Sequence, residues 1–316
     1  MITLKSLAGE LGLSIGTVSM ALNHSPKIHP DTIKRVESLA RKLNYSPNYL
    51  GRALQSGKSK LIGCFASSLQ CSFFDELVDS MGRFATSNGY GVMLNLGVDT
   101  NFESHIKNML AQRVEGIIFT NVREEVKSVI PILEKNNIPF VFCSTVKFLD
   151  YPTVANDDFY SGVIAAKCIL ENQHKVILLE ETTSKERIKG AVSILENNCT
   201  YCFFNDPKEV PNLVSKHKAT AVISFSDLVA ADIMFYLKKV NYSIPEDVSV
   251  LGHDNQAIFA RNEFNLSTID VQRSNLGKLA VDYIIKRSRG LAVEKTTLLK
   301  PSLLLRSTVA NAKKQN

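Results

Sequence analysis

The segment that decides the fold lies near the start of the chain and reads Ala8-Gly-Glu-Leu-Gly-Leu-Ser-Ile-Gly-Thr-Val-Ser-Met-Ala-Leu-Asn23. From Leu4 to Leu11, apolar residues recur at the i, i+3, i+4, i+7 spacing of an amphipathic helix. Thr3 is predicted to cap this helix, and Gly12 to end it. Ser14 is predicted to cap a second helix over Ile15–Leu22. Two short helices joined by a glycine-containing turn are typical of a helix-turn-helix.

A third helix and an excess of positive charge follow. Pro30 suits the first position of a helix, where its missing N–H costs nothing. Residues 1–60 hold nine Lys and Arg against three Asp and Glu, whereas the other 256 residues carry 28 of each sign. The whole net charge of +6 therefore lies in the first fifth of the chain. A basic, folded segment is typical of a head that binds a polyanion, and a solvated basic tail is the alternative.

Three sequence pieces match one known family. They are Ser14-x-x-Thr-Val-Ser-x-x-Leu-Asn23, Lys34-Arg35-Val36 and Leu43-Asn-Tyr-Ser-Pro-Asn48, and further matches run to about Thr308. With these pieces the chain resembles the LacI/GalR family of bacterial transcription regulators. The resemblance implies a cytoplasmic homodimer that binds near-palindromic operator DNA and is controlled allosterically by a small molecule, without a cofactor. Its second helix would enter the major groove of the operator.

The resemblance assigns DNA contacts residue by residue. Thr17 and Ser19 suit phosphate oxygens, whereas Ile15, Gly16 and Met20 occupy the base-reading positions. Most relatives carry polar residues there and an Arg at the position of Met20, so we expect an operator half-site richer in A·T pairs. The predicted DNA-contacting residues are Thr3, Ser14, Ile15, Gly16, Thr17, Ser19, Met20, Asn23, Tyr45, Asn48 and Leu54.

A linker by composition, residues 46–60, follows the head of residues 1–45. Tyr49–Gln55 is long enough for two turns of helix, which is too short to persist alone in water. The resemblance implies a hinge helix that forms when two subunits meet on DNA and inserts Leu54 into the minor groove. Such an apolar wedge unstacks a base step and bends the duplex. A plain flexible tether is the alternative.

From Leu61 onward, apolar runs typical of strands alternate with helical patterns, which predicts an α/β fold with parallel sheets. The expected strands are Leu61–Ala66, Gly91–Leu96, Glu115–Thr120, Phe140–Ser144, Lys175–Glu180, Tyr201–Phe204, Ala219–Ser224 and Val248–Gly252. The expected helices include Phe74–Asn88, Phe102–Arg113, Val126–Asn136, Tyr160–Asn172, Leu228–Val240 and Leu276–Arg289. The resemblance implies that residues 61–310 form two Rossmann-like lobes, like those of periplasmic binding proteins, with crossovers near residues 150, 272 and 297. The cleft between the lobes is then the expected ligand site.

Five residues match ligand positions of the family. They are Phe73 as an aromatic wall, the acids Asp157 and Asp254, Arg187, and Ser226 where an Asn is usual. Carboxylates that accept and a guanidinium that donates in pairs suit a polyhydroxylated metabolite such as a sugar. In the alternative interpretation, the charges only hold the lobes together. The chain also departs from its relatives, because it lacks Trp, has His253 at an aromatic position, and is about ten residues shorter between Arg187 and Ser226.

Other chemistries find little support in the sequence. The six cysteines lie mostly in apolar runs, so buried reduced thiols are favoured over a metal or redox site, even at Cys199-x-x-Cys202. Gly12-Leu-Ser-Ile-Gly16 matches a nucleophile elbow, but that motif needs a preceding strand. Histidines show no metal-ligand spacing, and no stretch is long and apolar enough for a membrane span.

The sequence thus predicts a ligand-regulated repressor, not an enzyme, that controls a carbohydrate or nucleoside utilisation operon. A sugar-binding protein and a two-lobed enzyme, each with an incidental basic head, remain as alternatives. The sequence leaves open whether the effector is an inducer or a corepressor, and whether the protein represses or activates.

Overall fold

The computed structural model describes residues 2–45, 58–66, 72–96, 101–120, 122–144, 148–182 and 184–312. The chain divides at Lys60 into two compact units. We call the first unit the head and the second the body, and describe each by itself. Among the described residues, the longest helices fall short of the length and apolarity that a membrane crossing requires.

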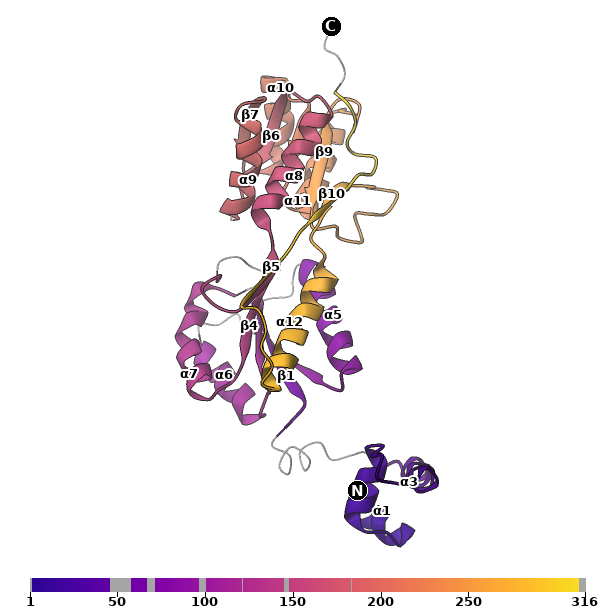
Figure 1. Ribbon diagram of the computed structural model, residues 1–316. Coiled ribbons are helices and arrows are strands. Elements are labelled where there is room, and N and C mark those ends of the chain that lie inside the picture. The colour runs from indigo at the N-terminus through magenta and orange to yellow at the C-terminus, as the bar shows by residue number, and fades with distance from the viewer. Residues whose placement is uncertain are drawn as a thin grey trace. The chain divides into compact units, whose positions relative to one another are not determined.

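The head consists of three helices, α1 (Leu4–Leu11), α2 (Ile15–Leu22) and α3 (Pro30–Lys42) (Figure 1). Thr3 caps α1 by accepting a hydrogen bond from the backbone N–H of Ser6, and Gly12 ends the helix in the left-handed conformation at φ 64°. Ser14 caps α2 by accepting from the N–H of Thr17, and Pro30 starts α3. These caps confirm the predicted boundaries, because each residue satisfies backbone groups that a helix end leaves unpaired.

The head has a small apolar core. Its buried side chains are Leu7, Ala8, Val18, Ala21, Val36 and Ala40. Half-buried residues, among them Ile33, Leu43 and Tyr45, surround this core. So few buried side chains give a domain of marginal stability.

The first lobe of the body is a six-stranded parallel sheet with helices on both faces. Its strand order is β11-β5-β4-β3-β1-β2. The strands are β1 (Leu61–Ala66), β2 (Gly91–Leu96), β3 (Ile117–Thr120), β4 (Phe140–Cys143), β5 (Thr153–Asn156) and β11 (Thr296–Leu299). Helices α5 (Ser72–Ser87) and α12 (Arg273–Ser288) pack together on one face, as Figure 1 shows. The other face is covered by α6 (Phe102–Ala111), the 3₁₀ turn η1 (Glu124–Val129) and α7 (Ile130–Lys135).

The second lobe repeats this plan with one antiparallel edge strand. Its strand order is β12-β10-β9-β8-β6-β7, and β12 runs antiparallel to β10. The strands are β6 (Val176–Glu180), β7 (Thr200–Phe204), β8 (Ala221–Ile223), β9 (Ser249–His253), β10 (Ser267–Asp270) and β12 (Ser302–Leu304). Helices α8 (Asp158–Glu171) and α9 (Lys185–Leu195) cover one face. The 3₁₀ turn η2 (Pro207–Glu209), α10 (Val210–His217) and α11 (Asp227–Lys239) cover the other.

The structure confirms the α/β class and corrects several details. The predicted helix Val126–Asn136 is split into η1 and α7, because Pro131 at the start of α7 cannot donate a helical hydrogen bond. Four strands, β5, β10, β11 and β12, were not predicted from sequence, since they are short and rich in Thr and Ser. The chain leaves each lobe after Asn156, Asp270 and Leu299, compared with the expected positions near 150, 272 and 297.

Candidate DNA-binding head and effector cleft

Helix α2 buries one face and exposes two large apolar side chains on the other. Val18 and Ala21 are fully buried, whereas Ile15 is 47% and Met20 39% exposed. An amphipathic helix normally turns such side chains inward. Their exposure on the predicted recognition helix is therefore consistent with contact to base edges, where apolar groups meet thymine methyls.

The hydroxyls of Ser14 and Thr17 lie 2.8 Å apart at the start of α2. The N-terminus of a helix offers unpaired N–H groups and a partial positive charge, both of which suit a phosphate. At the other end, the side-chain amide of Asn23 donates to the carbonyl of Ser19 at 2.8 Å. Thr3 is exposed at the start of α1, whereas Tyr45 is half-buried against the head core. Gly16 and Ser19 belong to α2, and the predicted contacts Asn48 and Leu54 lie outside the described residues.

In the second lobe, two glycines let α8 and α9 cross at very short range. A Cβ atom on Gly162 would collide with the backbone of Arg187, and one on Gly190 with the carbonyl of Phe159. Arg187 is thereby held next to Asp158, with its Nε 3.0 Å from Oδ1 of that acid. Arg187 also donates to the carbonyl of Phe225 at 3.3 Å. The side chains of this ion pair are only 18% and 13% exposed.

The predicted ligand acid Asp157 has a local structural role. Its Oδ1 accepts a hydrogen bond from the N–H of Tyr160 at 2.8 Å and so caps α8. The acid that pairs with Arg187 is its neighbour Asp158, whose Oδ2 also accepts from the hydroxyl of Ser184 at 2.7 Å. Sequence reasoning missed Asp158, although the adjacent pair of acids signalled two candidates.

The carboxyl ends of β8 and β9 carry the other predicted acid and serine. Asp254 follows β9, has a φ of 109°, and lies 2.9 Å from Nδ1 of His253 through its Oδ1. Ser226 precedes α11 but makes no side-chain capping bond there. Its neighbour Asp227 is buried and accepts from the hydroxyl of Thr268 and the N–H of Gln256. Burial raises the pKa of Asp227 to about 7, although these two hydrogen bonds act to lower it.

Glu180, at the end of β6, is a further acid that sequence reasoning missed. Its Oε2 accepts two 2.6 Å hydrogen bonds, from the hydroxyl of Ser224 and the N–H of Phe225. Burial raises the pKa of Glu180, while those hydrogen bonds and nearby Arg187 oppose the rise. Because carboxyl ends of parallel strands meet at one edge, Glu180, Asp254 and the Arg187–Asp158 pair lie at the same edge of this sheet.

Phe73, on α5 of the first lobe, faces a guanidinium group. Arg273, the first residue of α12, lies with its guanidinium carbon 5.8 Å from the ring centre of Phe73. Its Nη2 lies 2.6 Å from Oε2 of Glu76 and donates to the carbonyl of Asn255 at 2.7 Å. Asn255 follows β9 of the second lobe, so Arg273 joins the two lobes. Arg273 is therefore a charged residue that holds the lobes together, although it is not one of the charges that the sequence placed in the cleft.

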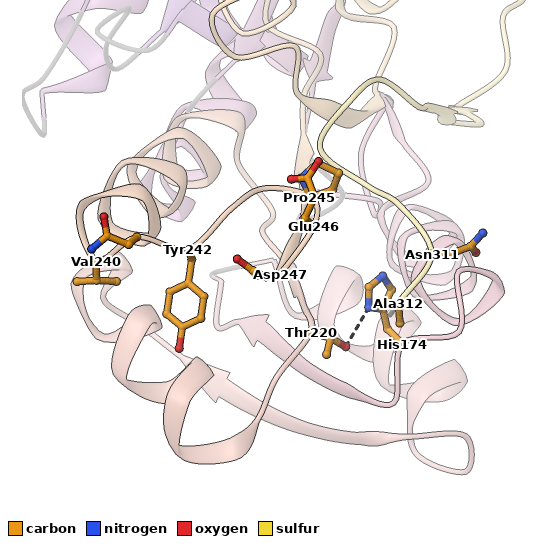
Figure 2. A pocket seen from close by; sticks show the side chains of 10 residues that line it. His174, Thr220, Val240, Tyr242, Pro245, Glu246, Asp247, Asn311 and Ala312 are labelled. Atoms are coloured by element: carbon orange, nitrogen blue, oxygen red, sulfur yellow. Dashed lines mark hydrogen bonds between the residues drawn. The ribbon is translucent and has the colours of Figure 1, made fainter. Parts of the chain in front are cut away.

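A cavity of about 330 Å³ lies elsewhere in the second lobe (Figure 2). Its lining includes His174, Thr220 and Asp247, which precede β6, β8 and β9. It therefore opens at the amino ends of these strands, opposite to the edge that carries Arg187 and Asp254. His174 lies against Thr220 in Figure 2, with 2.9 Å between Nδ1 and the hydroxyl oxygen. Ligands of parallel α/β sheets bind at the carboxyl ends, so this cavity is not the predicted cleft.

The cysteines partly follow the prediction. Cys64, Cys143 and Cys168 are buried, and burial raises the pKa of the Cys64 thiol to about 12 and that of Cys168 to about 11. Cys199 and Cys202 are only half-buried, contrary to the expectation, because Cys202 lies on the edge strand β7 and Cys199 in the turn before it. Cys71 lies outside the described residues. Within the described ranges, His, Cys, Asp and Glu form no group that could hold a metal ion.

Comparisons with known proteins cover nearly the whole chain. Residues 3–48 match the family model for bacterial regulatory proteins of the lacI family. Residues 59–194 match the periplasmic binding proteins and sugar binding domain of the LacI family, and residues 167–309 match a periplasmic binding protein-like domain. A similar curated protein is the HTH-type transcriptional repressor PurR of Actinobacillus pleuropneumoniae serotype 3, 27% identical over 99% of this chain and 100% of that protein. PurR of Aliivibrio fischeri is also 27% identical, over 98% of this chain and 99% of that protein.

Solved structures share the fold. The lac repressor dimer bound to operator and the anti-inducer ONPF aligns with a TM-score of 0.83 at 23% identity, over 98% of this chain and 99% of that chain. A LacI family regulator from Enterococcus faecium with bound ribose aligns with a TM-score of 0.68 at 20% identity, over 80% of this chain and 100% of that chain. The similar curated proteins are transcriptional repressors rather than enzymes. With its head and both lobes matched in this order, the chain belongs to the LacI family of bacterial regulatory proteins, which are DNA-binding transcription regulators.

Proposed function

We propose that this protein is a homodimeric repressor in the bacterial cytoplasm, and that a small, neutral, polyhydroxylated metabolite controls its affinity for an operator. The Arg187–Asp158 ion pair, at the carboxyl edge of the second sheet, is the observation that supports a polyhydroxylated effector. A guanidinium and a carboxylate side by side offer paired donors and acceptors, which match neighbouring hydroxyls. Similar curated proteins are named as repressors, which supports the direction of control.

The charges at this edge favour a neutral effector over an anionic one. Asp158 balances Arg187, and Glu76 balances Arg273. Asp157, Glu180 and Asp254 add acidic groups at the same edge, where an unpaired phosphate or carboxylate would be repelled. The similar regulator from Enterococcus faecium holds ribose, which supports a sugar, and a nucleoside also fits the chemistry. Phe73, Asp157, Arg187, Ser226 and Asp254 remain the proposed ligand residues.

On the DNA side, the exposed Ile15 and Met20 support the proposal of an A·T-rich half-site read partly through thymine methyls. Two heads related by two-fold symmetry would bind a near-palindromic operator. Leu54 is proposed as the minor-groove wedge of this complex. The residues proposed to position the backbone are Thr3, Ser14, Thr17, Ser19, Asn23, Tyr45 and Asn48.

The test is a footprint of the full-length protein on DNA flanking its own gene, with and without neutral sugars and nucleosides. We expect a protected, near-palindromic site whose affinity one of these compounds changes at least tenfold. Allostery requires such a difference in affinity between the two states of the protein. If the protein protected no sequence with any compound present, the proposal would be wrong.

The wedge is tested by replacing Leu54 with Ala. We expect operator affinity to fall by about tenfold while affinity for random DNA is unchanged, since a lost wedge removes the contacts of the bent duplex only. Fluorescence anisotropy on both DNAs measures the two affinities. Equal losses on both would refute the wedge, and Gln55→Ala on the neighbouring position is the matched control.

A further inference from the structure

His253 carries a buried ring nitrogen that has no partner in the part of the chain that the structure describes. The side chain is fully buried at the end of β9. Its Nδ1 lies 2.9 Å from Oδ1 of Asp254, whereas Nε2 receives no hydrogen bond from any described residue. A buried polar atom that is left without a hydrogen bond destabilises the folded protein, because it has lost its bonds to water and gained none. Such an atom therefore calls for an occupant that the protein itself does not supply.

The orphaned nitrogen belongs to a pattern. Among the described residues, the hydroxyl of Thr120 and the side-chain oxygen of Asn156 are also buried without a partner. Thr120 ends β3 and Asn156 ends β5, just as His253 ends β9. Three unsatisfied polar atoms thus lie at the carboxyl ends of strands, which is where α/β sheets bind their ligands.

Strand alternation places the imidazole beside Arg187 and Asp158. Side chains two apart in a strand share a face, so His253 shares that of Leu251, which packs in the core beneath α8 and α9. The ring of Phe225, from the same core, meets the imidazole edge-on at a centroid distance of 6.3 Å. Arg187 donates a hydrogen bond to the carbonyl of this same Phe225 at 3.3 Å and is paired with Asp158, so both charged groups lie next to the residue whose ring contacts the imidazole.

The neighbours of His253 decide which proton the ring carries. A carboxylate oxygen accepts hydrogen bonds, so the ring nitrogen that faces Oδ1 of Asp254 at 2.9 Å is the one that bears hydrogen. Burial lowers the pKa of His253, with Arg187 adding to this effect and Asp254 opposing it, so the ring is neutral near pH 7. A neutral imidazole with hydrogen on Nδ1 presents a lone pair at Nε2.

We propose that Nε2 of His253 accepts a hydrogen bond from a hydroxyl or N–H group of the effector, which makes His253 a specificity-determining residue of the cleft. The proposal rests on the proposed function, because it assumes that a metabolite occupies this edge. It requires that the metabolite has a hydrogen-bond donor facing β9. Removing this donor, or replacing it with an ether or keto oxygen, should weaken the binding of the metabolite. Sites built to bond a substrate donor discriminate strongly against analogues that lack it.

The test uses full-length protein labelled with ¹⁵N-histidine and two measurements. Nuclear magnetic resonance first reads the tautomer of His253, and His174 is the internal control, since both of its ring nitrogens already have partners. The probes D-ribose, D-xylose and adenosine are then titrated, and each one that binds is compared with its monodeoxy analogues. Wild type is compared with His253→Phe, which keeps an aromatic ring but has no lone pair.

We expect an unprotonated Nε2 whose resonance moves when a probe binds, while the His174 resonances stay in place. One deoxy analogue should bind wild type about tenfold more weakly than its parent and bind His253→Phe no more weakly, as expected for the loss of one shared hydrogen bond. Three outcomes would each overturn the inference. The first is a protonated Nε2, and the second is an Nε2 resonance that does not move when a probe binds, which would mean that only a structural water occupies this position. The third is a deoxy analogue that loses as much affinity for His253→Phe as it loses for wild type. A footprint unaffected by all probes would instead refute the effector class of the proposed function.

Discussion

The head and the body of this chain differ in whether they bury polar side chains. In residues 2–45 the buried side chains are all apolar, and the two large side chains proposed to contact bases, Ile15 and Met20, are exposed on α2. In the body, His253, Asp254, Asp227 and Arg273 are all buried. Surface recognition by the head depends on which residues occupy one helix face, whereas recognition by the body depends on buried partners. Substitutions should therefore act locally in the head and through neighbours in the body.

The largest effect is expected at the Arg187–Asp158 pair. Arg187→Met leaves the mostly buried Asp158 without its partner, which for buried pairs costs about 3–5 kcal/mol, discounted here to about 3 because both groups are partly exposed. Chemical denaturation should show this loss, and the response of operator binding to the effector should disappear. Lys189→Met is the matched control on α9, since its pair with Glu186 is exposed and should contribute little. Equal effects of both variants would contradict the special role of the buried pair.

A smaller effect, with opposite signs in the two units, is expected for glycine-to-alanine changes. Gly190→Ala forces a Cβ against the carbonyl of Phe159 and should destabilise the body by about 2 kcal/mol or more. Gly9→Ala, inside α1, meets nothing within 4 Å and should stabilise the head by up to about 1 kcal/mol through helix propensity. Thermal unfolding of the full chain measures both changes. A destabilising Gly9→Ala would show that the head is packed as tightly as the body.

An intermediate change in specificity, with little effect on stability, is expected at Met20. This side chain is 39% exposed on α2, so an arginine fits there without repacking the core. Met20→Arg should shift a selected half-site toward a G·C pair by about tenfold, because arginine forms a paired contact with guanine worth roughly 1–3 kcal/mol. Selection from a randomised operator library tests this outcome. If the selected consensus did not change, Met20 would not be a base-reading residue. Lys5→Arg, at an exposed position of α1, is the control for the effect of a larger side chain.

The subtlest expected effect is a pH dependence that originates in the body. Asp227 has a pKa of about 7 in the folded protein because it is buried, compared with 3.8 when unperturbed. The folded chain thus holds a proton that the unfolded chain releases, so this group makes the free energy of unfolding fall as pH rises from about 4 to about 7. Asp227→Asn should flatten that slope in urea titrations. Asp232→Asn, exposed on the same helix, should leave it unchanged, and an unaltered slope in both would show that Asp227 ionises as if in water.

Much of the candidate site was predictable because its signals are local. The caps Thr3, Ser14 and Gly12 act on backbone groups within three or four residues, and Arg187 and Asp254 could be matched one by one to family positions. The missed groups act over long separations. Asp158 reaches Arg187 across 29 positions, and Arg273 reaches the carbonyl of Asn255 across 18. Periodicity over a few turns carries no information about such pairs.

The sequence by itself determined the α/β class and a basic, helical head ahead of it, whereas the two lobes and the base-reading positions Ile15 and Met20 came from the resemblance to a known family. The first two features follow from the period of apolar residues and from charge, which need no partner. Only the tertiary structure decided which acid pairs with Arg187, that Arg273 joins the lobes, and that Nε2 of His253 finds no partner among the residues that the structure describes. The physical reason is that a buried polar group is defined by what surrounds it, and folding alone brings those neighbours together.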